Sequence, residues 1–455
     1  MSNVPMTLPE LMIAVHDTSC GHSSTFVELD DGRVLHHAGY WCNHSEDGGV
    51  TWSKLEGRVK DINGDDVGGA ECSLVRLSEK QSIGLAARLR DEPVDASWPL
   101  PPNGCHFKFW CSNDNGLTWQ PPVRMSAPGT STAGYQDTFL RTGSGRIVLP
   151  VFNCIGQKRN RKDSTLPFWF TGHQHSSIAG KLVNNKFLPT GGHFFDARFT
   201  CVYFLYSDDD GRTWQRNEDA ELVPHLDWNT ASSYCNETSV TEVSPGRLLA
   251  MMRNGLGRLL QAWSNDNGQT WTQPQPTCLA ADTTPAQIRT LPNGHLLCVW
   301  NQHSETETKQ GYNRTRVSSA VSRNGGSVWE FFQNVQSLFE STRVEPGPIA
   351  PVRPAELYPE AGQSALPREM EHVASRDQHA RWGYPSVLVM ADRVLIAHTY
   401  TVFQEHPTLA DMVQSSKGEG AVNQKLKVLP LKWFYGGKEP TDNSHLHEAY
   451  EPAKP

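Results

Sequence analysis

A small group of residues in this chain combines the side chains that bind a carboxylate with those that move a proton. Arg253 and Arg314 carry planar guanidinium groups, which bind a carboxylate through two parallel hydrogen bonds. Glu237 is a carboxylate of the kind that accepts protons, and Tyr384 carries a weakly acidic hydroxyl. Together these groups would suit an anionic, sugar-like ligand, provided that the fold brings them together.

These residues lie at the edges of short apolar segments that have the pattern of β-hairpins. Each segment contains an apolar strand, a polar or Gly-containing turn and a second apolar strand. Six of them occur, at 24–35, 72–85, 137–149, 238–250, 286–297 and 385–396. Because a recurring hairpin is typical of a propeller with one four-stranded blade per copy, we predict an all-β fold, a six-bladed β-propeller.

A second repeat, S-x-[DN]-x-G-x-[TV]-W, alternates with the hairpins. The copy "SDDDGRTW" at 207–214 resembles a calcium loop, but it lacks the alternating oxygen ligands and the closing glutamate of such a loop. An Asp or Asn that bonds nearby N–H groups, followed by Gly and a packed Trp, is instead typical of a tight turn. We therefore expect turns between the third and fourth strands of the blades, and no metal site. The other copies are at 45–52, 112–119, 264–271 and 322–329.

The repeats run from about residue 20 to 437 without a linker, which predicts one closed domain over residues 1–455. Two stretches, at about 155–200 and 331–383, are predicted to be insertions on the face that carries the site. A late strand at 425–437 is expected to close the ring. The content of 14 Trp, 37 Gly and 30 Pro agrees with a turn-rich sheet protein.

Charge and hydropathy argue against several classes of function. The formal net charge of -8 predicts no general attraction to nucleic acid, and no apolar run reaches the roughly 18 residues of a membrane span. The start of the chain lacks the pattern of a signal peptide, so we expect a cytoplasmic protein, or a secreted one whose signal peptide is absent from this chain. Ten scattered cysteines are expected to be reduced. We expect no cofactor, and the oligomeric state is open.

In a propeller, the start of each innermost strand and the end of the strand that returns beside it lie on one face of the ring. Residues at such positions should therefore converge. A single arginine at a strand end is more often solvated or paired with a surface acid, so the prediction depends on this convergence. The candidates at the starts of the innermost strands are His22, Glu71, Gln136 with Asp137, Glu237, Asp282 or Thr284, and Tyr384. The candidates at the ends of the returning strands are Tyr40, Arg88, Arg90, Asn153, Arg253, Asn301 and His398, and Arg314 belongs to the same face.

At these positions the chain resembles the sialidase (neuraminidase) superfamily. The tight turns resemble its Asp boxes, and the likeness covers nearly the whole chain. The segment "NETSVTEVSPGRLLAMMR" at 236–253 is similar to the one in which a glutamate opens a strand and an arginine ends the returning strand. The resemblance implies that Tyr384 is a nucleophile activated by Glu237, and that Arg253 and Arg314 bind the carboxylate of the substrate.

The implied activity is exo-acting hydrolysis that releases a terminal acidic sugar, sialic acid or a related keto-sugar acid, from a glycoconjugate. A sugar with a carboxylate at its anomeric carbon repels an anionic nucleophile, whereas a neutral tyrosine avoids this repulsion. Since an unperturbed tyrosine has a pKa of about 10, it needs a base to take its proton.

Two positions depart from the pattern of the superfamily. Where sialidases have an arginine before the first hairpin, this chain has His22, which can donate to a carboxylate or move a proton. The aspartate that serves as the acid after the first hairpin is missing, and Asp91 or Glu71 is nominated in its place. The expected catalytic residues are thus Tyr384, Glu237, Asp91 and His22, and the expected substrate-binding residues are Arg253, Arg314, Arg88, Glu71, Gln136 and Asn301.

Two other functions stay open. A polysaccharide lyase, or a glycosidase that acts on uronate-containing glycans, would use His22 and a tyrosine as acid and base. A non-catalytic glycan-binding propeller has no evident need for a paired glutamate and tyrosine. The products distinguish these functions, because elimination leaves an unsaturated sugar and hydrolysis does not.

Overall fold

The computed structural model describes residues 11–18, 24–55, 57–90, 105–126, 132–154, 180–183, 186–189, 200–217, 221–224, 235–254, 257–282, 284–303, 314–337, 380–402 and 423–438. Blade one contains β2 (Ser24–Glu28), β3 (Val34–Ala38) and β4 (Trp41–Ser45). Blade two contains β5 (Ala70–Arg76), β6 (Ile83–Arg90), β7 (Cys105–Ser112) and β8 (Val123–Arg124). Blade three contains β9 (Thr132–Ala133), β10 (Leu140–Arg141), β11 (Ile147–Cys154), β14 (Thr200–Ser207) and β15 (Gln215–Arg216).

The second half of the chain forms the other three blades. Blade four contains β16 (Asn236–Ser244), β17 (Arg247–Arg253), β18 (Arg258–Ser264) and β19 (Gln275–Ala280). Blade five contains β20 (Gln287–Thr290), β21 (Leu296–Trp300), β22 (Arg316–Ser322) and β23 (Glu330–Ser337). Blade six contains β24 (Ala380–Val389), β25 (Arg393–Val402), β26 (Asn423–Pro430) and β1 (Ala14–Thr18).

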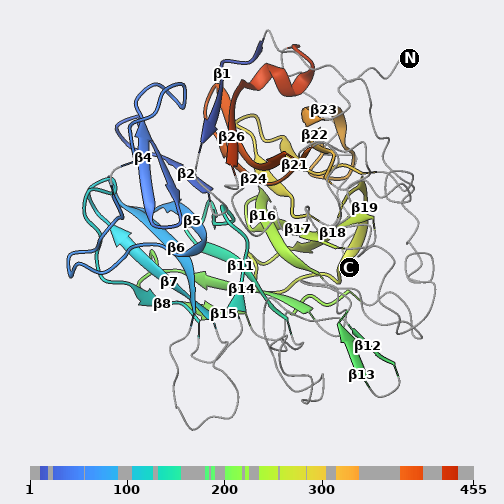
Figure 1. Ribbon diagram of the computed structural model, residues 1–455, viewed down its shortest axis with the longest axis horizontal. Coiled ribbons are helices and arrows are strands. Elements are labelled where there is room, and N and C mark those ends of the chain that lie inside the picture. The colour runs from blue at the N-terminus through green and yellow to red at the C-terminus, as the bar shows by residue number, and fades with distance from the viewer. Residues whose placement is uncertain are drawn as a thin grey trace.

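The blades form a closed ring (Figure 1). The innermost strands contact one another in an unbroken circle, in which β2 contacts β5 and β24, β10 contacts β5 and β16, and β20 contacts β16 and β24. The six predicted hairpins form β2–β3, β5–β6, β10–β11, β16–β17, β20–β21 and β24–β25, one in each blade. The predicted six-bladed β-propeller is therefore confirmed.

The ring closes differently from the prediction. The last strand, β26, is only the third strand of blade six, and the N-terminal strand β1 pairs with it as the fourth, with Ala14 opposite Val428 and Thr18 opposite Gln424. The expected strand at 425–437 ends at Pro430 and continues as the short 3-10 helix η2 (Leu431–Tyr435). The closure therefore joins the two ends of the described chain through backbone hydrogen bonds.

Of the two expected insertions, the greater part lies outside the described residues. Between β11 and β14 the structure describes a two-stranded hairpin of β12 (Gly180–Val183) and β13 (Lys186–Pro189). At the other stretch, residues 330–337 belong to β23 and residues 380–389 to β24, so both ends of that stretch are blade strands.

An apolar cluster fills each interface between neighbouring blades. The alternation of side chains along a strand explains how one strand serves two interfaces. In β17, Leu248 and Ala250 pack toward blade three, whereas Leu249 and Met251 pack toward blade five. The six clusters thus hold the blades in place around the axis, which positions the ends of the innermost strands.

Four of the five repeated turns, at 112–119, 207–214, 264–271 and 322–329, join the third and fourth strands of their blades, as predicted. The turn at 45–52 follows β4, the last strand that the structure describes in blade one. In the copy at 207–214, Asp209 accepts hydrogen bonds from Ser207 Oγ, the Thr213 amide and Thr213 Oγ1 at 2.8, 2.9 and 2.6 Å. The indole of Trp214 donates to the carbonyl of Gly211 at 3.0 Å. The carboxylate of Asp209 is therefore used within the turn, while its neighbours bind other parts of the protein: Asp208 pairs with Arg146, and Asp210 accepts from the Ser78 amide.

The turns lie at the opposite end of the blades from the candidate site. In blade four, Asn236 pairs with Arg253 at one end, and Leu248 pairs with Ser264 at the other end, where the turn at 264–271 begins. Glu237 follows Asn236, so it lies on the face away from the turns. In the part of the chain that the structure describes, no helix has the length and apolar character needed to cross a lipid bilayer.

Asp47→Ala is expected to lower the free energy of unfolding by about 1–2 kcal/mol, because the turn at 45–52 loses its central acceptor. Asp47 accepts from Ser45 Oγ and from the Val50 and Thr51 amides at 2.8, 3.0 and 2.8 Å. Although burial acts against it, hydrogen bonds from Thr51 and Ser45 lower the pKa of Asp47 to about 2. Its contribution to stability is thus present at neutral pH and is lost as the pH falls from about 4 toward 2.

Denaturant unfolding at pH 7 measures this loss. Glu46→Ala is the matched control, because it removes the neighbouring exposed acid from the same turn and should change stability by less than about 0.5 kcal/mol. Equal effects of the two substitutions would contradict the role given to Asp47.

Candidate active site

Three innermost strands carry their functional residue on a β-bulge at the same place. Glu71 in β5, Glu237 in β16 and Tyr384 in β24 have φ angles of 53°, 33° and 53°, a region that non-glycine residues rarely adopt. The register shifts span residues 70–73, 236–239 and 383–386. A bulge redirects a side chain, and such strain is concentrated at functional sites. The fold thus aims three side chains from separate blades at one mouth of the ring.

Tyr384, Glu237 and Arg253 form a hydrogen-bonded group. The hydroxyl of Tyr384 donates to Oε1 of Glu237 at 3.4 Å, and Nη1 of Arg253 donates to the Tyr384 oxygen at 3.2 Å. The same nitrogen forms an ion pair with Oε2 of Glu237. The side chains of Arg253 and Glu237 are 1% and 8% exposed, so these charges interact with little screening by water. A base and a cation therefore flank one phenol.

Arg314 completes the group from blade five. Its guanidinium carbon lies 5.1 Å from the centre of the Tyr384 ring, which is within the range of a cation–π contact. Both backbone groups of Arg314 are hydrogen-bonded. Its amide donates to Asp282, and its carbonyl accepts from the Trp382 amide at 3.1 Å. Arg314 thus places a second positive charge beside the phenol.

The pKa of Tyr384 is raised above its ordinary value of 10.0. Burial is the largest cause, and the negative charge of Glu237 adds to it, whereas Arg253 and Arg314 act in the opposite direction. The phenol is therefore neutral at physiological pH, and it would need a base to become a nucleophile.

Glu71 and Arg88 form a second ion pair on the same face of the ring, and this pair is only partly buried. Arg88 Nε lies 2.8 Å from Oε2 of Glu71, which also accepts from the Gly134 amide at 2.8 Å. Burial raises the pKa of Glu71, with Arg88 acting against it and the charge of Glu237 adding to it. Glu71 and Glu237 occupy matching bulges in β5 and β16, so blades two and four present both carboxylates at the same mouth of the ring.

Gln136 and Asn301 were predicted to bind substrate, and the structure shows another use for their amides. Nε2 of Gln136 donates to the carbonyl of Tyr384 at 3.0 Å. Nδ2 of Asn301 donates to the carbonyls of Arg316 and Trp382 at 2.6 and 2.9 Å. Both side chains are buried, at 2% and 0% exposed. We infer that they position the backbone of the site, and direct binding of substrate stays a prediction for both.

The remaining predicted residues, His22 and Asp91, lie outside the described residues, so their roles stay predictions. The sequence reasoning missed Tyr135, whose ring lies 6.1 Å from that of Tyr384 in an edge arrangement. It directly precedes Gln136 in the chain, so the same positional rule could have included it. Among the described residues, no group of three His, Cys, Asp or Glu side chains is placed to hold a metal ion.

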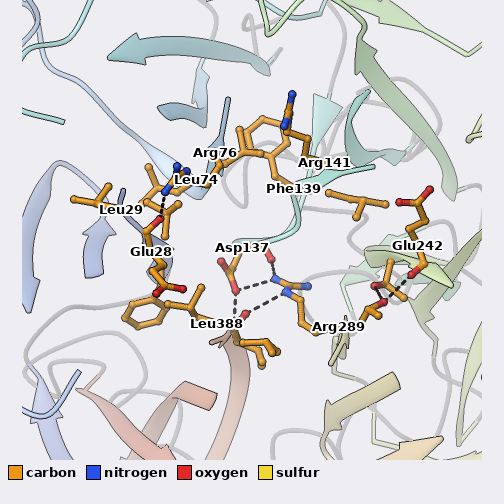
Figure 2. A pocket seen from close by; sticks show the side chains of 18 of the residues that line it. Glu28, Leu29, Leu74, Arg76, Asp137, Phe139, Arg141, Glu242, Arg289 and Leu388 are labelled. Atoms are coloured by element: carbon orange, nitrogen blue, oxygen red, sulfur yellow. Dashed lines mark hydrogen bonds and ion pairs between the residues drawn. The ribbon is translucent and has the colours of Figure 1, made fainter. Parts of the chain in front are cut away.

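A pocket of about 750 Å³ opens at the other end of the axis (Figure 2). It is lined by the ends of the innermost strands that lie next to the hairpin turns. Its charges are largely paired within the protein, since Arg76 binds Asp30 and Arg289 binds Asp137. Neither Tyr384 nor Glu237 lines this pocket, so it is separate from the mouth that holds them. Asp137, which was expected at that mouth, lines this pocket instead.

Glu237→Gln is expected to lower the pKa of Tyr384, because the charge that opposes formation of the phenolate is removed while Arg253 and Arg314 stay. An ultraviolet titration of the tyrosines, corrected by the same titration of Tyr384→Phe, measures this pKa. The matched control is Glu242→Gln, which removes the same charge at the far end of β16 and should leave the pKa unchanged. An unchanged or higher Tyr384 pKa in Glu237→Gln would contradict the geometry.

The family model described as a BNR repeat-like domain matches residues 96–396, which is more than half of the chain. The chain therefore belongs to that family. With six blades and their repeated Ser-x-Asp turns, it is a propeller of the sialidase superfamily.

The chain is similar to a sialidase of Bacteroides fragilis (strain YCH46), with 23% identity over 314 residues. This match covers 64% of the chain and 48% of that sialidase, so it spans about half the length of the relative. The fold is similar to that of the Hadza microbial sialidase Hz136, with a TM-score of 0.52, 14% identity and coverage of 94% and 68%. It is also similar to the Trypanosoma rangeli sialidase in complex with the inhibitor DANA, with a TM-score of 0.50, 14% identity and coverage of 92% and 56%. At these identities the solved structures show the fold alone.

Proposed function

We propose that this protein is a glycoside hydrolase of the sialidase type, which releases a terminal acidic sugar from a glycoconjugate. The observation that carries this proposal is the contact of the Tyr384 hydroxyl with Glu237 at 3.4 Å and with Arg253 at 3.2 Å. A binding site alone has no need for a partly buried phenol that lies between a base and two cations. The similarity in sequence to a sialidase of Bacteroides fragilis supports the same reaction class.

The proposed first step transfers the sugar to the protein. Arg253 and Arg314 attract the carboxylate of the sugar, which places the anomeric carbon near Tyr384. The Tyr384 oxygen attacks this carbon while its proton passes to Glu237. The bond to the leaving group breaks, and the leaving oxygen takes a proton from an acid. Asp91 and Glu71 are the two candidates for this acid.

In the second step, water attacks the anomeric carbon and releases the sugar. The acid that protonated the leaving group now takes a proton from the water, and Glu237 returns its proton to the Tyr384 oxygen. The product is the free acidic sugar, and the protein ends in its starting state. Two displacements at one carbon predict that the configuration is retained.

The raised pKa of Glu71 bears on the choice of acid. A carboxyl group acts as an acid only while it is protonated, so burial extends the pH range in which Glu71 could serve. If Glu71 is the acid, activity should fall as the pH rises through its pKa, and Glu71→Gln should remove this alkaline limb. If Asp91 is the acid, the limb should persist in Glu71→Gln.

Product analysis tests the proposed function. The protein is incubated with sialosides, glycosides of related keto-sugar acids and uronate polymers, and the products are identified by mass and by NMR. We expect a free acidic sugar that is first released with retained configuration. An unsaturated product would establish a lyase instead, and affinity without any product over a range of pH would establish a binding propeller.

A further inference from the structure

The backbone that follows Tyr384 is held by side chains from other blades. The carbonyl of Tyr384 accepts from Gln136 Nε2 at 3.0 Å, and the carbonyl of Pro385 accepts from the Tyr135 hydroxyl. At Val387, the amide donates to Asp137 Oδ2 at 2.7 Å and the carbonyl accepts from Arg289 Nε at 3.1 Å. Blades three and five thus bind four backbone groups of β24, on Tyr384, Pro385 and Val387.

These contacts provide hydrogen-bond partners for backbone groups that the sheet itself leaves unpaired. An innermost strand has a neighbouring strand on one edge only, so its other edge presents unpaired backbone groups to the centre of the ring. Without side-chain partners, these N–H and C=O groups would form hydrogen bonds with water or with one another. Here Tyr135, Gln136 and Asp137, three consecutive residues before β10, supply the partners.

An ion pair at the centre of the ring anchors these partners (Figure 2). Arg289 Nη2 lies 2.9 Å from Oδ2 of Asp137, and the two side chains are 18% and 6% exposed. Asp137 also accepts from Thr25 Oγ1 in blade one at 2.9 Å, and its amide donates to the Cys72 carbonyl in blade two at 2.8 Å. The pair therefore ties four blades to β24.

A glutamine connects this pair to Gln136. Arg289 Nη1 donates to Gln287 Oε1 at 2.7 Å, and Gln287 Nε2 donates to the Gln136 carbonyl at 2.9 Å. Gln287 thus binds the backbone of Gln136, and the side chain of Gln136 binds the backbone of Tyr384. The φ angle of 53° at Tyr384 is strained, and such strain persists only where the surroundings fix it.

We infer that Tyr135, Gln136, Asp137, Gln287 and Arg289 form an axial clamp that positions the hydroxyl of Tyr384 against Glu237 and Arg253. The residues of the clamp act through the backbone of β24 and are positioning residues. The expected effect on turnover rests on the proposed function, whereas the expected effect on the phenol itself does not.

The test is Gln136→Met, which removes the amide donor to Tyr384 and keeps the size of the side chain. Gln333→Met is the matched control, because Gln333 is also buried and its Nε2 also donates to a main-chain carbonyl, that of Trp433 in η2. We expect kcat to fall by about 10–100-fold in Gln136→Met with little change in KM, since a small misplacement of a reacting group is costly. The control should keep its kcat, although both variants lose a similar amount of thermal stability.

A second readout keeps the inference testable if no hydrolysis is found. Tyrosine labelled with ¹³C at Cζ gives an NMR signal for Tyr384, assigned by its loss in Tyr384→Phe. The clamp predicts a changed chemical shift and a changed pKa of this phenol in Gln136→Met and neither in Gln333→Met. If Gln136→Met fails to fold, Gln136→Asn replaces it in this test. Asn keeps the amide, but its shorter side chain does not bring the amide to the Tyr384 carbonyl, so the same changes in chemical shift and pKa are expected.

Two outcomes would overturn the inference. One is a Tyr384 signal and titration in the folded Gln136 variants that match those of the unaltered protein. The other is an equal loss of kcat in Gln136→Met and Gln333→Met, which would show a general effect of lost stability. Absent turnover in the unaltered protein would refute the proposed function alone.

Discussion

Tyr384→Phe is expected to lower kcat for hydrolysis of an acidic glycoside by at least about 10³-fold while the protein stays folded. The substitution removes one oxygen, which is the atom that would form the bond to the sugar. It keeps the ring that packs against Tyr135 and Arg314. Initial rates measure the effect, and the melting temperature measures the fold.

Tyr206→Phe is the matched control, because Tyr206 also donates its hydroxyl to a side chain, Gln215, at 3.0 Å in blade three. It should keep full turnover. Substantial turnover in Tyr384→Phe would remove the covalent mechanism, and another residue would then have to form or assist the reacting bond.

Arg253→Met is expected to cost about 3–5 kcal/mol of stability and to abolish turnover, because it leaves Glu237 as a buried charge without its main partner. Arg253 is 1% exposed and Glu237 is 6% exposed. Chemical denaturation measures the loss. The double variant Arg253→Met with Glu237→Leu should recover much of the stability and none of the turnover, because neither charge then stays buried alone.

Arg323→Met is the control for this substitution. Arg323 forms an ion pair with Glu330 at 2.6 Å, but the glutamate is 33% exposed, so water can replace the lost partner. Its loss should cost about 1 kcal/mol or less. A similar cost for Arg253→Met would show that the buried pair contributes little, and a double variant no more stable than Arg253→Met would contradict the stated cause.

The fold was predictable where the sequence pattern has the period of a strand. The segments at 238–250 and 385–396 alternate or run apolar around a polar turn, and they form β16–β17 and β24–β25 as expected. The closing strand β1 was missed because Ala14–Thr18 is short and polar, so nothing local marks it as a strand. Its pairing with β26 depends on the ring bringing distant segments together, which is a property of the whole fold.

The site was predictable only in part. Glu237, Arg253, Arg314 and Tyr384 were placed together because the position along a strand determines the face of the ring. That rule does not say which way a side chain points. Gln136 satisfies the same rule, yet its amide binds the backbone of Tyr384. The central Arg289 was missed because it lies inside β20, and the positional rule considered only the starts and ends of strands.

The bulges explain why direction could not be read from the sequence. Alternation along a strand assigns side chains to opposite sides, and one extra residue reverses that assignment. Glu71, Glu237 and Tyr384 lie at such positions and have positive φ angles although none is glycine. Nothing in their local sequence predicts this conformation, because contacts with other blades impose it.

A search for a covalent bond between the sugar and Tyr384 tests the proposed mechanism most directly. The protein is mixed with an acidic sugar that carries fluorine as a leaving group at the anomeric carbon and a second fluorine on the adjacent carbon, which slows release. The protein is then digested, and the peptides are weighed. We predict one glycosyl group on the peptide that contains Tyr384, and none in Tyr384→Phe. Hydrolysis of a natural acidic glycoside without any sugar on Tyr384 under trapping conditions, or a sugar on another residue, would contradict it.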